Sequence, residues 1–428
     1  MPDTILLCQA AAAGLILARA AAAVALERLN QRHVLAHRDT VPEAFRNVMD
    51  APTYQQSVAY TLAKSRFAQV ETVYHTLFLA AIVFSGLLPW AHDKVTAAFG
   101  TPAWVMAAFL FGVALAFSLS DLPTDGWAQF RLEQQYGFNT TPAKLWWADR
   151  CKGLLLSTLL GYPLLLLVLK IAEWLGSAWW LAAWAAILAF QFLVGLLAPA
   201  VILPLFNKFK PLPEGPLKDR LVALAQRTGF RARSIQVMDG SKRSRHSNAF
   251  FTGFGRFRKI VLFDTLLEQL DDPQLEAVLA HEIGHNKKRH IVKMLVASAL
   301  GLLVALAALA WLAGQPWFPR AFGFASHDLS VTFLLFGLLG GTVTYWLSPV
   351  VNLWLRRNEY EADAFAATAM STGEPLIGAL RKLSERNLAN LTPHPIYSAF
   401  HYSHPTLLER EQALRTPSRR PPQPGNET

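Results

Sequence analysis

The sequence predicts a mainly α-helical, polytopic membrane protein that carries a small α+β domain. Of its 428 residues, 53% are hydrophobic and only 16% are charged, and the mean hydropathy is +0.25. An ordinary soluble domain has about 25% charged residues. The apolar residues gather into seven runs, each long enough to cross a bilayer as a helix. Between the fifth and sixth runs the composition changes to that of a soluble domain, which indicates a folded insert.

The predicted spans follow one another along the chain with polar loops between them. Spans one to five belong to residues 1–206, and spans six and seven to residues 291–355. We expect them at residues 5–26, 73–91, 104–120, 153–174, 178–206, 291–313 and 329–355. Arg19 lies inside the first span, so it should face a polar interior, because a charged side chain is costly in lipid.

Two polar segments are expected to form the soluble part of the protein. Residues 207–290 are the insert, in which Ser234–Met238, Asn248–Phe251 and Lys259–Phe263 are predicted to be short strands. Residues 356–415 are helical and polar and should complete the domain. The Pro-rich, basic residues 416–428 are predicted to be a disordered tail.

His281, Glu282 and His285 form the H-E-x-x-H pattern of a zinc-dependent peptidase. Asp271 or Asp272 can cap a helix here, and apolar residues recur at helical spacing through the motif. On such a helix the two imidazoles lie one turn apart and can reach one metal ion. The alternative is a chance match of five residues. A genuine site needs a third protein ligand, which should come from a later helix.

Glu359 and Asp363 are the candidates for completing that site. They are four residues apart on a helix that is predicted to continue from span seven, so both face the same way. One carboxylate can bind the metal while the other holds the second nitrogen of a ligand histidine. The alternative is a solvated helix face that begins with an acidic pair. We favour the ligand interpretation because the H-E-x-x-H motif is expected on the same side of the membrane.

The basic residues support that topology. Most of them lie in the polar segments after spans one, three, five and seven. By the positive-inside rule these segments are cytoplasmic, and so is the predicted site. The net charge of +10 therefore reflects the basic loops that orient the protein in the membrane, and no motif indicates a nucleic-acid partner. The Ala-rich, compact sequence, whose tail lacks a basic retrieval signal, indicates the inner membrane of a bacterium.

Most of the chain resembles the type I CAAX prenyl proteases, which are integral-membrane metallopeptidases of the gluzincin type. The resemblance rests on motifs at residues 131–133, 136–139, 247–250, 259–267, 281–285, 358–366 and 402–410. It implies seven helices around a water-filled intramembrane chamber, capped by a small zincin-like α+β domain. It also implies one zinc ion, held by His281, His285 and Glu359, with Glu282 as the catalytic base. Asp363 matches the family's carboxylate behind the site, which is sometimes described as a proton donor.

Further roles also follow from the resemblance. Asn248 and Ala249 match the edge strand along which the substrate backbone pairs. His404 matches a histidine that stabilises the tetrahedral intermediate, although a capping or surface histidine is the alternative. Glu361 departs from the family pattern, since many members have glutamine there, and it adds a negative charge near the site.

The predicted function is that of a membrane-embedded zinc metalloendopeptidase that acts on peptide or protein substrates. The resemblance implies removal of C-terminal residues from prenylated peptides. A quality-control protease of the HtpX-like kind is an alternative within the same class. A transporter or channel would also explain seven spans, but it would not need two histidines and two glutamates together on one face.

Overall fold

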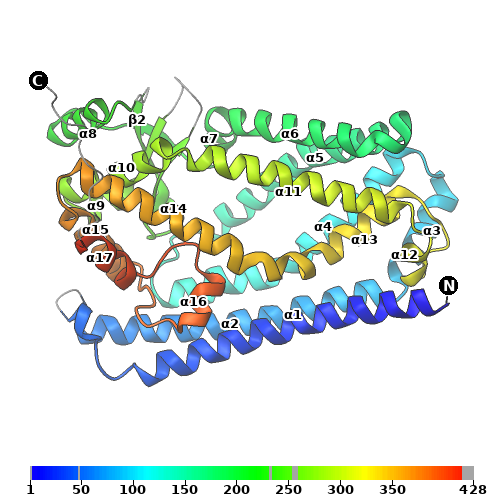
Figure 1. Ribbon diagram of the computed structural model, residues 1–428, viewed down its shortest axis with the longest axis horizontal. Coiled ribbons are helices and arrows are strands. Elements are labelled where there is room, and N and C mark those ends of the chain that lie inside the picture. Colours follow the sequence, from blue (N-terminus) through cyan, green and yellow to red (C-terminus); the bar gives the residue numbers. More distant parts are fainter. Residues whose placement is uncertain (1, 47–48, 231–233, 253–258, 417–428) are drawn as a thin grey trace, which may run out of the picture.

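The structure is a computed structural model that describes residues 2–46, 49–230, 234–252 and 259–416. Long helices lie side by side over most of its length, and a small sheet lies at one end, beside the helix that carries the H-E-x-x-H motif (Figure 1). The predicted tail lies outside the described residues except for its first residue.

Six helical stretches in the described ranges are long and apolar enough to cross a membrane. They are Asp3–Ala36, Ala51–Phe84, Ala103–Glu133, Ala143–Phe206, His290–Ala313 and Leu329–Ala369. The fourth is bent into a hairpin, because the 3-10 turn Gly176–Ala178 separates helix α5 (Ala143–Leu175) from α6 (Trp179–Leu197), and these two helices pack together (Figure 1). The structure thus confirms a helical, multi-pass membrane protein.

The helix ends differ from the predicted spans at two breaks. The remaining long helices are α1 (Pro2–Ala36), α2 (Ala51–Phe84), α4 (Ala103–Trp127), α11 (His290–Ala313), α13 (Leu329–Thr344) and α14 (Ser348–Ala369). The predicted second span, which ran to residue 91, is too long, because the chain turns at Gly86 with φ +79° before α3 (Leu87–Phe99). Left-handed φ values favour glycine. The predicted seventh span is also divided, by the 3-10 turn Tyr345–Leu347.

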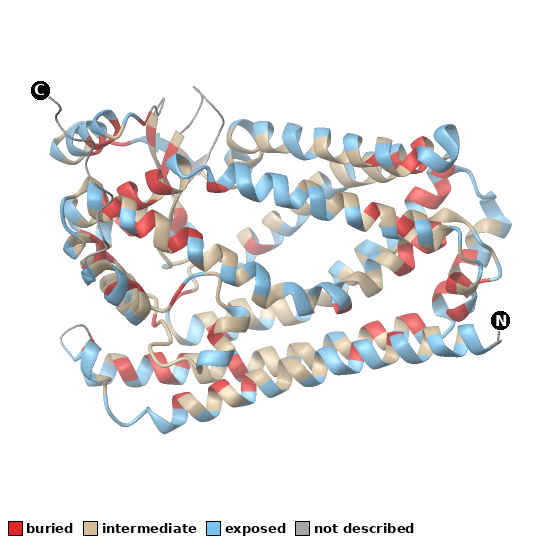
Figure 2. Cartoon of the chain, in the orientation of Figure 1, coloured by how far each residue is buried: buried red, intermediate tan, exposed pale blue. Residues whose placement is uncertain are grey.

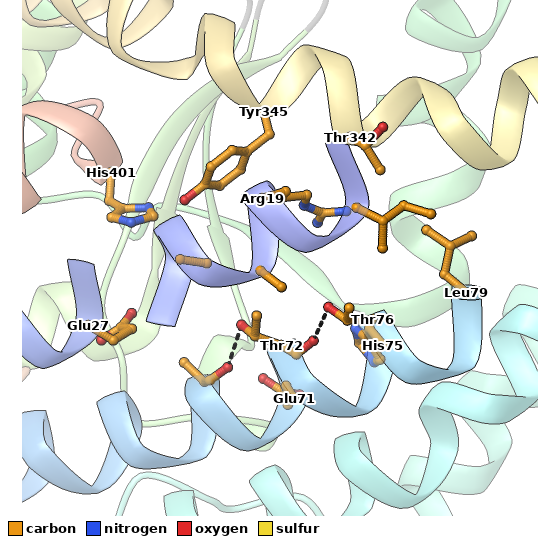
Figure 3. A pocket seen from close by; sticks show the side chains of 14 residues that line it. Arg19, Glu27, Glu71, Thr72, His75, Thr76, Leu79, Thr342, Tyr345 and His401 are labelled. Atoms are coloured by element: carbon orange, nitrogen blue, oxygen red, sulfur yellow. Dashed lines mark hydrogen bonds between the residues drawn. The ribbon is translucent and has the colours of Figure 1, made fainter. Parts of the chain in front are cut away.

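Arg19 faces a cavity, as its place in the first span requires. This cavity of about 300 Å³ lies among α1, α2, α13 and α16 (Pro395–His401), and Glu27 and Glu71 also line it (Figure 3). The guanidinium carbon of Arg19 is 5.7 Å from the centroid of the Tyr345 ring, a cation–π contact. A charged residue inside an apolar helix is therefore accommodated by polar and aromatic neighbours.

The sheet has four strands in the order β1-β2-β4-β3. Strands β2 (Ser234–Met238) and β4 (Lys259–Phe263) are parallel and have the predicted bounds. Strand β3 (Ala249–Thr252) pairs antiparallel with β4 and forms one edge of the sheet. Strand β1 (Phe209–Pro211), at the other edge, was not predicted, because its three residues are too few to show an alternating pattern.

Many of the buried residues lie toward the two ends of the molecule (Figure 2). One large core lies at the end near α3, and another surrounds the sheet. The latter is built from β2, β4, α8 (Pro216–Arg227), α9 (Asp264–Gln269), α10 (Asp272–Lys287), α14 and α15 (Glu374–Arg386). Between the two cores, apolar side chains on α11 such as Leu295 and Val296 are exposed, as expected of residues that face lipid. The site helix α10 therefore belongs to the core that surrounds the sheet.

Candidate metal centre

Helix α10 positions three of the predicted site residues. Asp271 caps it by accepting a hydrogen bond from the backbone N–H of Gln274, whose side chain bonds back to Asp271. This reciprocal capping box satisfies backbone groups that a helix start leaves free. Leu279 and Ile283 are fully buried in the domain core. With that face fixed, His281 and His285 project one turn apart toward α14.

Helix α14 brings the carboxylates to the same place. It packs along α10 so closely that a Cβ atom added to Gly284 would lie 3.0 Å from the backbone of Ala362. Glycine suits this position, because a side chain there would have to displace the neighbouring backbone of α14. Glu359 and Asp363 are buried on the facing side of α14.

The ligand atoms of His281, His285 and Glu359 lie within 4.8 Å of one another. His285 Nε2 is 3.2 Å from Glu359 Oε1 and 3.2 Å from His281 Nε2, and His281 Nε2 is 3.5 Å from Glu359 Oε2. Two imidazoles and one carboxylate that converge in this way are a ligand set that zinc accepts. The donor set therefore fits a divalent zinc ion, and the convergence predicted from the sequence is present.

Asp363 and Arg410 form a buried layer behind these residues. Asp363 Oδ1 is 2.8 Å from His281 Nδ1, which is the contact predicted for the second carboxylate. Arg410, on helix α17 (Leu407–Arg415), donates from Nε and Nη2 to the two carboxylate oxygens of Asp363 at 2.8 and 2.6 Å. Its Nη1 is 3.7 Å from Glu359 Oε2. One buried cation thus lies against two buried carboxylates.

Glu282 is set in the same site but is protonated more readily than an ordinary glutamate. Burial raises the pKa of its carboxyl, and Glu359 adds to the effect, while His281 and His285 oppose it. A carboxylate with a raised pKa is a stronger base near neutral pH, which suits a group that must accept a proton from water.

His404 also reaches the site. Its Nδ1 is 2.7 Å from Glu359 Oε2, although most of the ring is exposed. It comes from the segment between α16 and α17, and a capping box of Thr406 and Glu409 orders the start of α17. The alternative prediction was that His404 caps a helix, but the residue that caps α17 is Thr406.

The edge strand β3 packs beside α10 and begins with Ala249. Asn248 precedes the strand and is exposed; its backbone oxygen accepts a hydrogen bond from the N–H of Phe263. The motif at residues 131–139 supports this segment, because Arg245 donates its backbone N–H to the Phe138 oxygen at 3.1 Å. Asn248 and Ala249 therefore lie at an edge of the sheet, at the start of a strand that contacts the site helix α10.

The structure thus gathers every predicted site residue around α10, and it adds Arg410. That arginine lies in the motif at residues 402–410, but its role was not predicted from the sequence. Charge counting offers a signal in retrospect, since several acidic groups brought to one buried place need a cation.

Comparison with known proteins shows similarity over nearly the whole chain. Residues 30–208 match the family described as CAAX prenyl protease N-terminal, five membrane helices, and residues 211–418 match Peptidase family M48. A CAAX prenyl protease 1 homolog from Oryza sativa is 34% identical, over 90% of this chain and 92% of that protein. CAAX prenyl protease 1 from Saccharomyces cerevisiae is 35% identical, over 87% and 88%. The crystal structure of S. mikatae Ste24p superposes with a TM-score of 0.89 at 31% identity, covering 95% of this chain and 99% of that one.

Proposed function

Because the chain belongs to the CAAX prenyl protease 1 group of peptidase family M48, we propose that this membrane metalloprotease is a zinc endopeptidase of the gluzincin type. Its zinc ligands are His281, His285 and Glu359, one ion per chain. The observation that carries the proposal is the convergence of these three side chains from two helices within 4.8 Å. Neither a transporter nor a channel needs that arrangement.

The residues around this centre divide the work of peptide hydrolysis. When bound, a zinc ion polarises a carbonyl group and lowers the pKa of water toward about 7. Glu282 accepts the proton of the attacking water and passes it to the leaving amine nitrogen. His404 donates a hydrogen bond to the negative charge that develops on the carbonyl oxygen. Asp363 holds His281 through Nδ1, and Arg410 keeps Asp363 ionised and in place.

The substrate is an extended peptide that pairs with the edge strand β3 at Asn248 and Ala249. An exposed edge offers backbone N–H and C=O groups that a peptide can join in register. The name of these relatives, CAAX prenyl protease, supports a prenylated peptide that is cut near its C-terminus. The five-helix match at residues 30–208 favours this substrate class over the membrane proteins cut by an HtpX-like quality-control protease.

The membrane part completes the proposal. Counting α5 and α6 as separate crossings gives seven spans, which surround an intramembrane chamber, and the soluble part is a zincin-like cap. The distribution of basic residues puts the centre on the cytoplasmic side, and the composition suggests a bacterial inner membrane. A lipidated peptide could then approach from the bilayer in which the enzyme resides.

The test is metal analysis and peptide cleavage with purified protein. The parent should contain about one zinc ion per chain and cleave a CAAX reporter peptide. Glu282→Gln should keep the metal and lose cleavage by a factor of about 10² to 10⁴, because only the general base is removed. Glu268→Gln, which changes an exposed glutamate on α9, is the matched control and should leave both unchanged.

Two results would count against the proposal. If Glu282→Gln cleaves as fast as the parent, the assignment of the base and the site is wrong. If a farnesylated and an unmodified peptide are cut at the same rate, the peptidase stands but the prenylated substrate class does not.

A further inference from the structure

His290 contacts the ring of His285 on the side away from Glu359. Its Nδ1 is 3.1 Å from His285 Nδ1, and its Nε2 is 3.2 Å from Glu361 Oε2. The two rings meet edge to face with their centroids 5.0 Å apart. His290 is 0% exposed. The mechanism assigns no role to this buried histidine, although it touches a proposed metal ligand.

A break in the helix brings His290 to this position. In a continuous helix a residue five positions after His285 would lie about 140° away around the axis, at about 100° per residue. Instead, α10 ends at Lys287 and α11 begins at His290, and between them Arg289 adopts φ +56°. This left-handed conformation is unfavourable for a residue other than glycine. The turn is therefore strained, and it returns the chain to His285.

The hydrogen-bond chain has one consistent direction. His285 turns its Nε2 toward Glu359 and His281, so Nε2 is the nitrogen available to a metal ion. A neutral imidazole that binds metal through Nε2 carries its proton on Nδ1. His285 Nδ1 then donates to His290 Nδ1, and His290 donates from Nε2 to the Glu361 carboxylate. With the protons placed in this way, each ring nitrogen of His285 and His290 has a partner.

We infer that His290 and Glu361 are positioning residues that hold His285 in the orientation and tautomer needed to bind the metal ion. The inference rests on the proposed function in taking His285 as a ligand. Glu361 is itself held between Arg357 Nε at 3.4 Å and Lys293 Nζ at 3.8 Å. The two ligand histidines are thus oriented differently: His281 meets a carboxylate directly, and His285 meets one through a second imidazole.

The experiment measures zinc affinity of the full-length protein in detergent by competition with a chromophoric chelator. His290→Ala should weaken zinc binding by about 10- to 100-fold, the usual effect of removing a group that orients a ligand. His290→Asn should recover most of the affinity, because its amide oxygen can accept from His285 in place of Nδ1. Glu361→Ala should weaken binding in the parent but add nothing in the His290→Asn background, where its link to the ring is already cut.

His92→Ala is the control for loss of a buried histidine, since His92 is 1% exposed and lies on α3, at the other end of the molecule. It should keep the parent's zinc affinity. If His290→Ala does not fold, the zinc affinity of Glu361→Ala tests the inference by itself, because Glu361 is only half-buried and its replacement disturbs the packing less. If these variants bind zinc within twofold of the parent, the inference is wrong while the proposed function stands. If the parent itself binds no zinc, the proposed function fails first.

Discussion

Arg410→Ala tests whether one buried cation stabilises the acidic groups behind the metal centre. The change removes two hydrogen bonds to Asp363, of 2.8 and 2.6 Å. It also removes the positive charge 3.7 Å from Glu359. Both carboxylates are buried, so water cannot replace the lost partner without opening the packed domain.

The expected loss can be worked out in two ways. Two hydrogen bonds between charged groups contribute about 1.5–3 kcal/mol each, or about 3–6 kcal/mol together. Removing one partner of a buried ion pair costs about 3–5 kcal/mol. We therefore expect the free energy of unfolding to fall by about 3–5 kcal/mol. Arg38→Ala should cost less than about 1 kcal/mol, because Arg38 and Asp39 form an exposed pair at 3.3 Å, with side chains 55% and 82% exposed.

The assay is denaturant unfolding of the zinc-free protein in detergent, since bound metal would add its own stabilisation. The parent, Arg410→Ala, Asp363→Asn and the double variant form a mutant cycle. In the double variant no carboxylate is left unpaired at position 363, so its loss should be smaller than the sum of the single losses by about 0.5–3 kcal/mol. A loss below 1 kcal/mol for Arg410→Ala, or strict additivity, would refute the reasoning.

Three further predictions concern other parts of the fold. Gly284→Ala should cost about 1–3 kcal/mol and weaken zinc binding, because its Cβ would lie 3.0 Å from the backbone of Ala362 and force α10 from α14; unchanged affinity in the chelator assay would contradict this. His92 Nε2 lies 3.3 Å from Asp328 Oδ2, and Asp328 raises the pKa of His92. Burial would raise the pKa of Asp328, but His92 helps to lower it to about 2. The raised pKa of His92 contributes stability below 6.5, its ordinary pKa, and this contribution is lost as the pH rises through the raised value. The lowered pKa of Asp328 contributes stability above 3.8, its ordinary pKa, and this contribution is lost as the pH falls toward 2. His92→Gln should therefore destabilise most between these two ordinary values, and unfolding curves in which its deficit is equally large at pH 9 would exclude the pair. Asp271→Ala should cost about 1 kcal/mol through loss of the cap, with zinc affinity retained; thermal unfolding and metal analysis check both parts.

Much of the local structure could be predicted because it depends on near neighbours in the chain. The bounds of β2 and β4 follow from runs of strand-forming residues, and the start of α10 follows from Asp271 and its capping chemistry. The second span was predicted too long because the apolar run continues past Gly86, where the backbone turns. Apolar composition reports burial in lipid, but it does not report a change of helix direction.

The metal centre was predictable in part for the same reason. Spacing puts His281 and His285 on one helix face, and Glu359 and Asp363 on another, without any knowledge of the fold. Arg410 could not be assigned in this way, because nothing in its local pattern distinguishes a buried arginine from a solvated one. Its burial depends on the packing of α17 against α14 and α15.

The sequence by itself determined the class of protein, the order of its long apolar helices and of strands β2, β3 and β4, and which side chains could bind a metal, since hydrophobic periodicity and residue chemistry are local properties. Only the tertiary structure decided how closely α10 and α14 approach across Gly284, and that His290 returns to His285 at the turn of Arg289. Those contacts join segments that are far apart in the chain or related by a strained backbone angle. Their geometry is set by the packing of the whole domain, which no local pattern records.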